Sequence, residues 1–240
     1  MQIFNRRAAA LTLCLSLPFL AGCLGAIGGS GGGLREMVVT TDALVIAGPE
    51  GYCIDSEASA DRGETAFILL GNCAALTEAR LARQPAEPAI LTAAISEAGE
   101  EGGVASSLSS LPEFFASEDG RRVLSRSGDA ETVEVLQSFV DGSVFYLNAS
   151  DNSANAVPGV RDDYWRAYFD LGPRIATLSV LALDGSGLTE EQSIDLLRRF
   201  ATLTQSRNAA VTGVAVSEPE PSGGLLGGGG FMGRLFGGRG

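Results

Sequence analysis

The residue types that most enzymes use for proton and group transfer are scarce in this chain. Its 240 residues include no histidine, and all 17 basic residues are arginine. Without histidine there is no Ser-His-Asp or Cys-His nucleophile pair and no histidine-ligated zinc or haem. Without lysine there is no Schiff base and no Gly-Lys-Ser/Thr phosphate loop. Carboxylates, tyrosine, serine and cysteine are the side chains that remain for catalysis.

Three adjacent acidic pairs are the candidates for acid and base chemistry: Glu100-Glu101, Asp162-Asp163 and Glu190-Glu191. A glycoside hydrolase needs two carboxylates that face each other across its substrate. Neighbouring residues on a strand or helix point apart, so no pair provides this geometry by itself. Asp162-Asp163 also lacks the glycine-centred spacing of a calcium loop. We therefore predict no catalytic residue, no metal site and no cofactor.

Tyrosines beside an arginine form the surface that best suits a ligand. Strand alternation places Tyr164, Arg166 and Tyr168 on one face of a predicted strand, and Tyr146 lies on a neighbouring strand. Exposed tyrosines offer flat apolar area with a hydroxyl, which suits a glycan, a peptide or a partner protein. The alternative is ordinary cross-strand packing under a helix.

The sequence pattern around these residues predicts strands and hairpins that would position them. Apolar, β-branched runs at 37–47, 66–70 and 90–95 predict three strands. Asp141-Gly142, between runs at 132–140 and 143–149, predicts a hairpin. The short connection Gly172-Pro173-Arg174, between runs at 164–171 and 175–183, predicts another, because parallel strands would need a longer crossover.

Two capping boxes predict helices. Ser110 with Glu113 opens the first, which we expect to break at Gly120. Thr189 with Gln192 opens the second, which carries an apolar stripe at helical spacing. The fold class is therefore α+β, an antiparallel sheet with two helices packed on it, as a single domain over residues 34–216.

The first 22 residues have the pattern of an export signal. Arg6 and Arg7 supply positive charge, and residues 8–20 form an apolar run that is shorter than the ~20 residues needed to span a bilayer. The alternative is a soluble protein with an apolar N-terminal helix. The next residues, Leu20-Ala21-Gly22-Cys23, resemble the lipobox of bacterial lipoproteins.

The resemblance implies that the chain is cleaved before Cys23 and that this cysteine carries lipid, including palmitate. Two or more acyl chains anchor a protein stably where one is marginal. In lipoproteins an aspartate after the cysteine is the usual inner-membrane signal, and Leu24 stands there instead. The resemblance thus implies the outer membrane, with the domain facing the periplasm.

Glycine-rich segments flank the domain. Residues 25–33 hold six glycines, so 23–33 is expected to be a flexible tether between the lipid and the domain. Residues 223–240 hold ten glycines, and 217–240 is expected to be a disordered tail. The tail also carries Phe231, Phe236 and two arginines, so docking on a membrane or partner is the alternative.

Lipoprotein processing leaves two cysteines for other roles. Cys14 would leave with the signal and Cys23 would take the lipid, so Cys53 and Cys73 remain as an even pair in an oxidising compartment. We predict a disulfide that stabilises the fold by roughly 3 kcal/mol. The alternatives are a reactive thiol or a metal-binding pair.

The charge of the chain argues against a nucleic-acid partner. The net charge is −12, and removing two arginines with residues 1–22 makes it 15 minus 29, or −14. No basic stripe is present to neutralise phosphates. The leading hypothesis is a non-enzymatic accessory, scaffold or binding lipoprotein with a partner in the envelope. The alternatives are a carboxylate-dependent hydrolase acting on envelope glycans and a carrier of an apolar ligand in a dry internal pocket.

Overall fold

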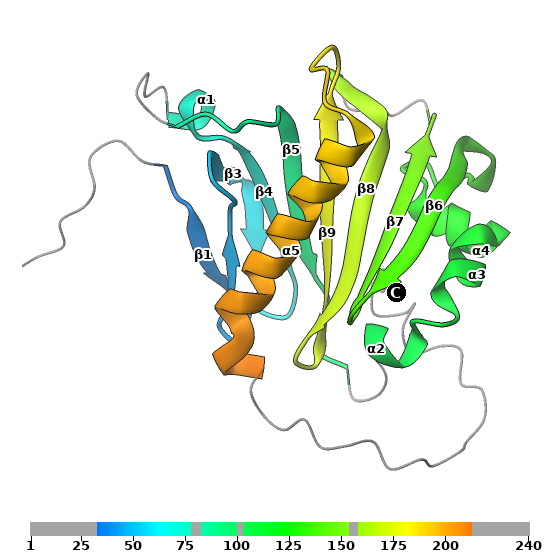
Figure 1. Ribbon diagram of the computed structural model, residues 1–240. Coiled ribbons are helices and arrows are strands. Elements are labelled where there is room, and N and C mark those ends of the chain that lie inside the picture. Colours follow the sequence, from blue (N-terminus) through cyan, green and yellow to red (C-terminus); the bar gives the residue numbers. More distant parts are fainter. Residues whose placement is uncertain (1–32, 78–82, 100–102, 154–157, 213–240) are drawn as a thin grey trace, which may run out of the picture. The chain divides into compact units, whose positions relative to one another are not determined.

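One large antiparallel sheet organises the computed structural model (Figure 1). The structure describes residues 33–77, 83–99, 103–153 and 158–212. Cys23, the export signal, the tether up to residue 32 and the tail from residue 213 lie outside these residues. The described part has the predicted α+β class.

The sheet has seven strands in the order β3-β4-β5-β9-β8-β7-β6. They are β3 (Tyr52–Asp61), β4 (Ala66–Asn72), β5 (Ala89–Ile95), β6 (Val133–Asp141), β7 (Val144–Asp151), β8 (Val160–Leu171) and β9 (Arg174–Leu183). Both predicted hairpins are present. Asp141 pairs with Val144 around Gly142, and Leu171 pairs with Arg174 around Gly172. Both glycines have positive φ, which suits tight turns.

The single strand expected over 37–47 is wrong. The segment forms a hairpin of its own, β1 (Glu36–Val39) and β2 (Leu44–Ala47). Thr40 and Ala43 take positive φ in its turn, at 63° and 55°. Neither residue type favours this conformation, so the sequence carried no turn signal there.

The α5 face of the sheet forms the larger core. Helix α5 (Glu190–Thr212) begins at the predicted capping box, because the Gln192 amide donates to Thr189 Oγ1 and the Thr189 amide donates to Gln192 Oε1. Its buried stripe includes Leu197 and Phe200. It packs with the β1–β2 hairpin and alternate residues of β8, among them Phe169, in one cluster. Asn208 accepts from and donates to the backbone of Val45, so the helix holds β2 by two hydrogen bonds of 2.8 Å.

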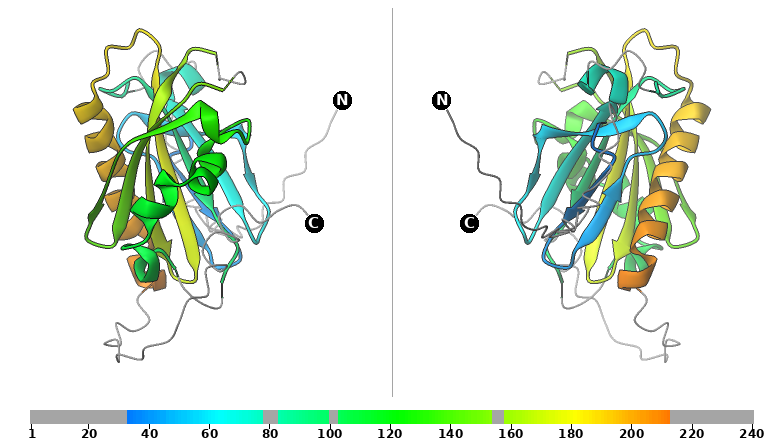
Figure 2. Two further views of the ribbon diagram at one scale, coloured as in Figure 1. Left: turned by 90° about the vertical axis from the view of Figure 1, so that its right-hand side faces the viewer. Right: turned by 90° about the vertical axis from the view of Figure 1, so that its left-hand side faces the viewer.

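Three short helices cover the β6–β9 part of the other face of the sheet (Figure 2). They are α2 (Val104–Ser107), α3 (Leu111–Ala116) and α4 (Glu118–Leu124). Phe115 of α3 is fully buried and stacks on Phe145 and Tyr168, with ring centroids 5.6 and 5.2 Å away. The expected break at Gly120 is wrong, because the helix breaks at Ser117. Gly120 lies inside α4, where a Cβ would stand 2.0 Å from the carbonyl oxygen of Phe114.

The predicted disulfide joins Cys53 and Cys73. Cys53 lies on β3 opposite Gly71 of β4, and Cys73 begins α1 (Cys73–Thr77). The two Cα atoms are 4.8 Å apart. This bond overturns the thiol and metal-pair alternatives for these residues.

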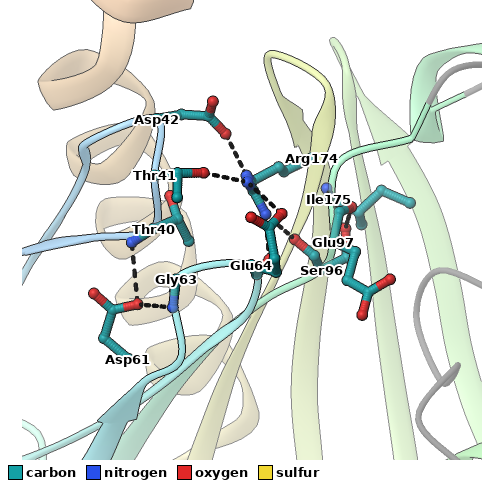
Figure 3. A network of polar contacts seen from close by, with 10 residues as sticks. All are labelled: Thr40, Thr41, Asp42, Asp61, Gly63, Glu64, Ser96, Glu97, Arg174 and Ile175. Atoms are coloured by element: carbon teal, nitrogen blue, oxygen red, sulfur yellow. Dashed lines mark hydrogen bonds and ion pairs between the residues drawn. The ribbon is translucent and has the colours of Figure 1, made fainter.

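A buried arginine ties three turns to the start of β9 (Figure 3). Arg174 is 1% exposed. Its guanidinium donates to the Asp42 carboxylate and the Glu64 carbonyl, to the Ser96 carbonyl at 3.1 Å and to Thr41 Oγ1 at 3.1 Å. These partners lie in the β1–β2 turn, the β3–β4 turn and the segment after β5. The five donors of one planar side chain thus fix three distant turns.

We expect Arg174→Met to lower the free energy of unfolding by about 3 kcal/mol, because it leaves the buried Ser96 carbonyl and the part-buried Glu64 carbonyl without their donor and removes the ion pair with Asp42. Arg174→Lys should recover only part of this loss, since an ammonium is a point donor without the guanidinium fork. Urea denaturation followed by circular dichroism measures both. Arg122→Met, which removes an exposed ion pair on α4, is the control and should cost about 0–1 kcal/mol. Equal losses at both positions would contradict this role.

Candidate functional site

The four residues considered as a possible partner surface take the alternative given for them, cross-strand packing. Tyr146, Tyr164 and Tyr168 are 4%, 3% and 0% exposed. Tyr164 and Tyr168 lie under α3 and α4, whereas Tyr146 belongs to the core on the opposite face. The arrangement is cross-strand packing, because helices cover both faces of β8. Burial also raises the pKa of each of these tyrosines, so all three are neutral.

Arg166 lies in a buried polar cluster beneath α4. Its guanidinium carbon stands 4.6 Å from the centre of the Tyr164 ring, in a cation–π contact. Nearby, Asp151 is fully buried and accepts from the backbone amides of Arg126 and Ser153 at 2.8 and 3.0 Å. Burial acts to raise the pKa of Asp151, but these hydrogen bonds outweigh it and lower the pKa. The cluster anchors the segment after α4 to the end of β7.

A groove between the sheet and α5 is the better candidate site. In Figure 1, α5 crosses β9 and β8 and leaves the same face of β7 and β6 uncovered. The groove has a volume of about 490 Å³. Its lining, which defines the β6–α5 groove, is Gln137, Phe139, Trp165, Thr189, Glu190, Glu191, Ile194 and Arg198. Ligand sites commonly hold roughly 300–1,000 Å³ and combine apolar surface with a few polar groups, as this groove does.

The floor of the groove is a row across three strands. Gln137 on β6 pairs with Asn148 on β7, which pairs with Trp165 on β8. The amide nitrogen of Asn148 donates to Glu190 Oε1 at 3.3 Å. Within the described part of the chain, Asn148 Oδ1 and Trp165 Nε1 are both buried without a hydrogen-bond partner. Buried polar groups are nearly always paired, so these two atoms leave hydrogen-bonding capacity unused next to the groove.

The aromatic wall of the groove is built around Phe139. Its ring stacks on Tyr146 at 5.1 Å and meets Trp165 edge-on at 5.9 Å. The Arg198 guanidinium lies 5.5 Å from the centre of the Phe139 ring. The result is a partly exposed Phe139 ring, backed by the buried rings of Tyr146 and Trp165, beside a cation and next to Glu190 and Glu191.

The structure separates the three acidic pairs. Glu190 and Glu191 both line the β6–α5 groove. Asp163 is held by two hydrogen bonds from Arg161, at 2.9 and 2.8 Å. Residues 100–101 lie outside the described residues. Among the residues described, no group of three or more acidic or cysteine side chains is placed to hold a metal ion.

Two further grooves lie on the other flank of α5. One of about 480 Å³ includes Gln84, Glu87 and Arg199, and the other includes Glu36 and Arg207. Their charges pair with each other, Arg199 with Glu87 at 2.8 Å and Arg207 with Glu36 at 2.6 Å. These arginines connect α5 to the segments around it, so the grooves present fewer unused polar groups than the β6–α5 groove.

Sequence reasoning missed most of this site. Strand alternation puts Trp165 on the face of β8 opposite Tyr164, where it is buried, and Glu190 was considered only as one of an adjacent pair. Gln137 and Phe139 lie on β6, the edge strand of the seven-stranded sheet. A single sequence does not reveal which strand lies at the edge. The usable sequence signal for this groove was Arg198, a charged residue that lies one helical turn after Ile194 on the apolar side of α5.

No protein-family model, curated protein or solved structure matches this chain. None of the helices in the described ranges is both long and apolar enough to cross a membrane.

The lowered pKa of Asp151 predicts a pH-dependent contribution to stability. Asp151→Asn should lower the free energy of unfolding by about 1–3 kcal/mol at neutral pH, because the amide cannot match the hydrogen bonds of the carboxylate. A lowered folded-state pKa gives stability above the unfolded-state value of about 3.9, and this stability disappears on acidification. The difference between wild type and variant should therefore be constant from pH 7 to about pH 5 and shrink toward pH 2. Urea denaturation at each pH measures it, with the exposed Asp184→Asn as control. A gap that widens on acidification would contradict the assignment.

Proposed function

We propose that this protein is a lipid-anchored binding protein of the cell envelope. It is a non-enzymatic accessory or scaffold, tethered through Cys23 to the outer membrane on the periplasmic side, that engages another envelope component through the β6–α5 groove. The observation that carries the binding role is the groove floor. There Phe139 packs against Trp165, and Asn148 Oδ1 and Trp165 Nε1 are buried without a hydrogen-bond partner among the described residues.

Two features of the chain support the location. The sequence Leu20-Ala21-Gly22-Cys23 resembles a lipobox and follows a short apolar run with two arginines before it. The Cys53–Cys73 disulfide is compatible with an oxidising compartment such as the periplasm.

A hydrolase of envelope glycans is the second candidate, and one observation favours it. Glu190 and Glu191 both line the groove beside aromatic residues, an environment that suits a sugar ring. The two residues are adjacent in the first turn of α5, however, and Glu190 is engaged by Asn148. A general acid and a base must act from opposite sides of the scissile bond, so binding accounts better for this geometry.

The carrier of an apolar ligand is the weakest alternative. Such a carrier needs a dry apolar cavity between sheet and helix. The three grooves described above, which are formed by residues of the described ranges, are each open and contain at least three charged residues.

The anchor predicts a processing result. In a bacterial host, the wild-type chain should incorporate labelled palmitate and lose residues 1–22, whereas Cys23→Ser should remain an unlabelled, full-length precursor. Radiolabelling with intact-mass analysis measures both. Cys14→Ser is the matched control and should be processed normally. Normal cleavage of Cys23→Ser would overturn the lipoprotein assignment.

The binding role predicts that one groove carries the partner. Purification of the full chain from gently solubilised membranes should recover an envelope component. Gln137→Arg, in the β6–α5 groove, should reduce this recovery about tenfold, because a long cation replaces the amide above the aromatic floor. Gln84→Arg, in the groove on the other flank of α5, is the matched control and should leave recovery unchanged. If Gln84→Arg alone reduced recovery of the partner, the partner would bind in the groove on the other flank of α5, and the proposed site would be wrong.

The hydrolase alternative has its own test. A purified chain that cleaves envelope glycans, and loses this activity in Glu190→Gln or Glu191→Gln, would favour the hydrolase.

A further inference from the structure

The β6 edge of the sheet is open. β6 ends the strand order and pairs only with β7. Apart from those pairings, no backbone hydrogen bond is made by residues 134–141 within the described part of the chain. An edge of this kind presents a row of unused amides and carbonyls that can pair with another strand.

The opposite edge is closed by contrast. The Ile54 amide of β3 donates to the Leu34 carbonyl at 2.6 Å, so the incoming chain lies along this edge. The β3–β4 register also shifts between Asp55 and Ala60, and Asp55 Oδ1 accepts from the amides of Glu57 and Ala58. The strand therefore bends away from flat pairing there. Of the two edges, β6 alone offers a usable template in the residues described.

Exposed apolar side chains accompany the open edge. Leu136 and Val140 are 48% and 43% exposed. The register shift between Val135 and Gln137 places Leu136 in a bulge, which leaves the segment from Gln137 to Asp141 as regular strand. On this segment Gln137 and Phe139 face the β6–α5 groove. A strand added here would lie about 4.8 Å outside β6, with alternate side chains toward the groove.

The charges around β6 determine which kind of strand can pair with its open edge. Exposed Glu134 and Asp141 stand at the two ends of the strand, and Glu190 and Glu191 lie in the groove beside it. Two copies pairing antiparallel about the centre of β6 would bring Glu134 of one against Asp141 of the other, at both ends. Like charges opposite each other destabilise strand pairs, and the chain carries a net charge of −12. A segment with a basic residue at each end meets complementary charge instead.

We propose that β6 binds an extended peptide segment of a protein partner by strand addition, with apolar or β-branched residues in the middle and a basic residue at each end. The inference rests on the proposed binding function and names its ligand class. Main-chain hydrogen bonds to β6 supply affinity, and the side chains that point toward Phe139 and the groove supply specificity. Acids at the two strand ends fix the position of the segment and exclude a second copy of the chain.

The test uses the full-length chain purified in detergent and a dye-labelled nine-residue peptide of alternating valine and threonine with terminal arginines. Fluorescence anisotropy measures the dissociation constant, and emission of Trp165, the single tryptophan of the chain, reports the groove. The peptide should bind and change Trp165 emission. The same peptide with alternate backbone amides methylated should bind at least about tenfold more weakly, because it keeps the side chains and loses strand donors.

A charge exchange provides the matched variant. Glu134→Arg with Asp141→Arg changes two exposed side chains and should weaken the arginine-ended peptide about tenfold, which is 1.4 kcal/mol for two surface pairs. The same variant should bind a glutamate-ended peptide that wild type does not bind. This gain of binding also shows that the variant is folded.

Three outcomes would overturn the inference. The first is no binding of the peptide to wild type at 1 mM. The second is binding that methylation and the charge exchange leave unchanged, which would mean that the side chains dock without strand pairing. The third is a dimer of the wild-type chain by analytical ultracentrifugation that Val140→Asp, a charge placed in the middle of the edge strand, abolishes, which would make a second copy the occupant. The proposed envelope function fails separately, on Cys23 processing and partner recovery, so the two can be distinguished.

Discussion

A buried guanidinium at the start of β9 determines where the other elements can lie. Arg174 connects the turns of β1–β2 and β3–β4 and the end of β5. It thereby holds the β1–β2 hairpin over the sheet, while Asn208 holds the same hairpin from α5. A hairpin fixed at both points occupies one flank of α5, so the helix crosses β8 and β9 rather than β6 and β7. The uncovered strands on its other flank are what form the groove.

The parts of the fold that follow from the sequence are those specified by local interactions. The Asp141-Gly142 turn and the Thr189 capping box need only neighbouring residues, and both are present. The β1–β2 turn depends on distant groups, because Thr40 and Ala43 take their unusual backbone angles where Arg174 supplies partners. The helix break at Ser117 is local by contrast. Ser117 accepts from the Gly120 amide and caps α4, and two acids follow it in the first turn, so a capping signal was present in the sequence.

The candidate site was harder to predict because both faces of β8 are buried. A strand with polar residues on alternate positions normally has one wet face, which made Tyr164 and Tyr168 look accessible. Here α3 and α4 cover that face, and phenol rings supply much of its apolar surface. The disulfide was predictable because the resemblance to a lipobox accounts for Cys14 and Cys23 and leaves two cysteines. The groove required strand order, since Gln137, Asn148 and Trp165 meet only when β6, β7 and β8 are neighbours.

If the chain is anchored to a membrane as proposed, an open strand edge is a hazard, because tethering raises the effective concentration of its neighbours. The acids at the ends of β6 and the bulge at Leu136 are the devices by which natural sheets oppose self-pairing. They do not block the edge completely, since Gln137 to Val140 carries no charge and Val140 remains exposed. Complete protection would need a charge or a proline in that stretch. The protection that is present acts against acidic strands such as β6 itself and leaves access for strands of opposite charge, which is the pattern of an edge that discriminates between partners rather than one that excludes them all.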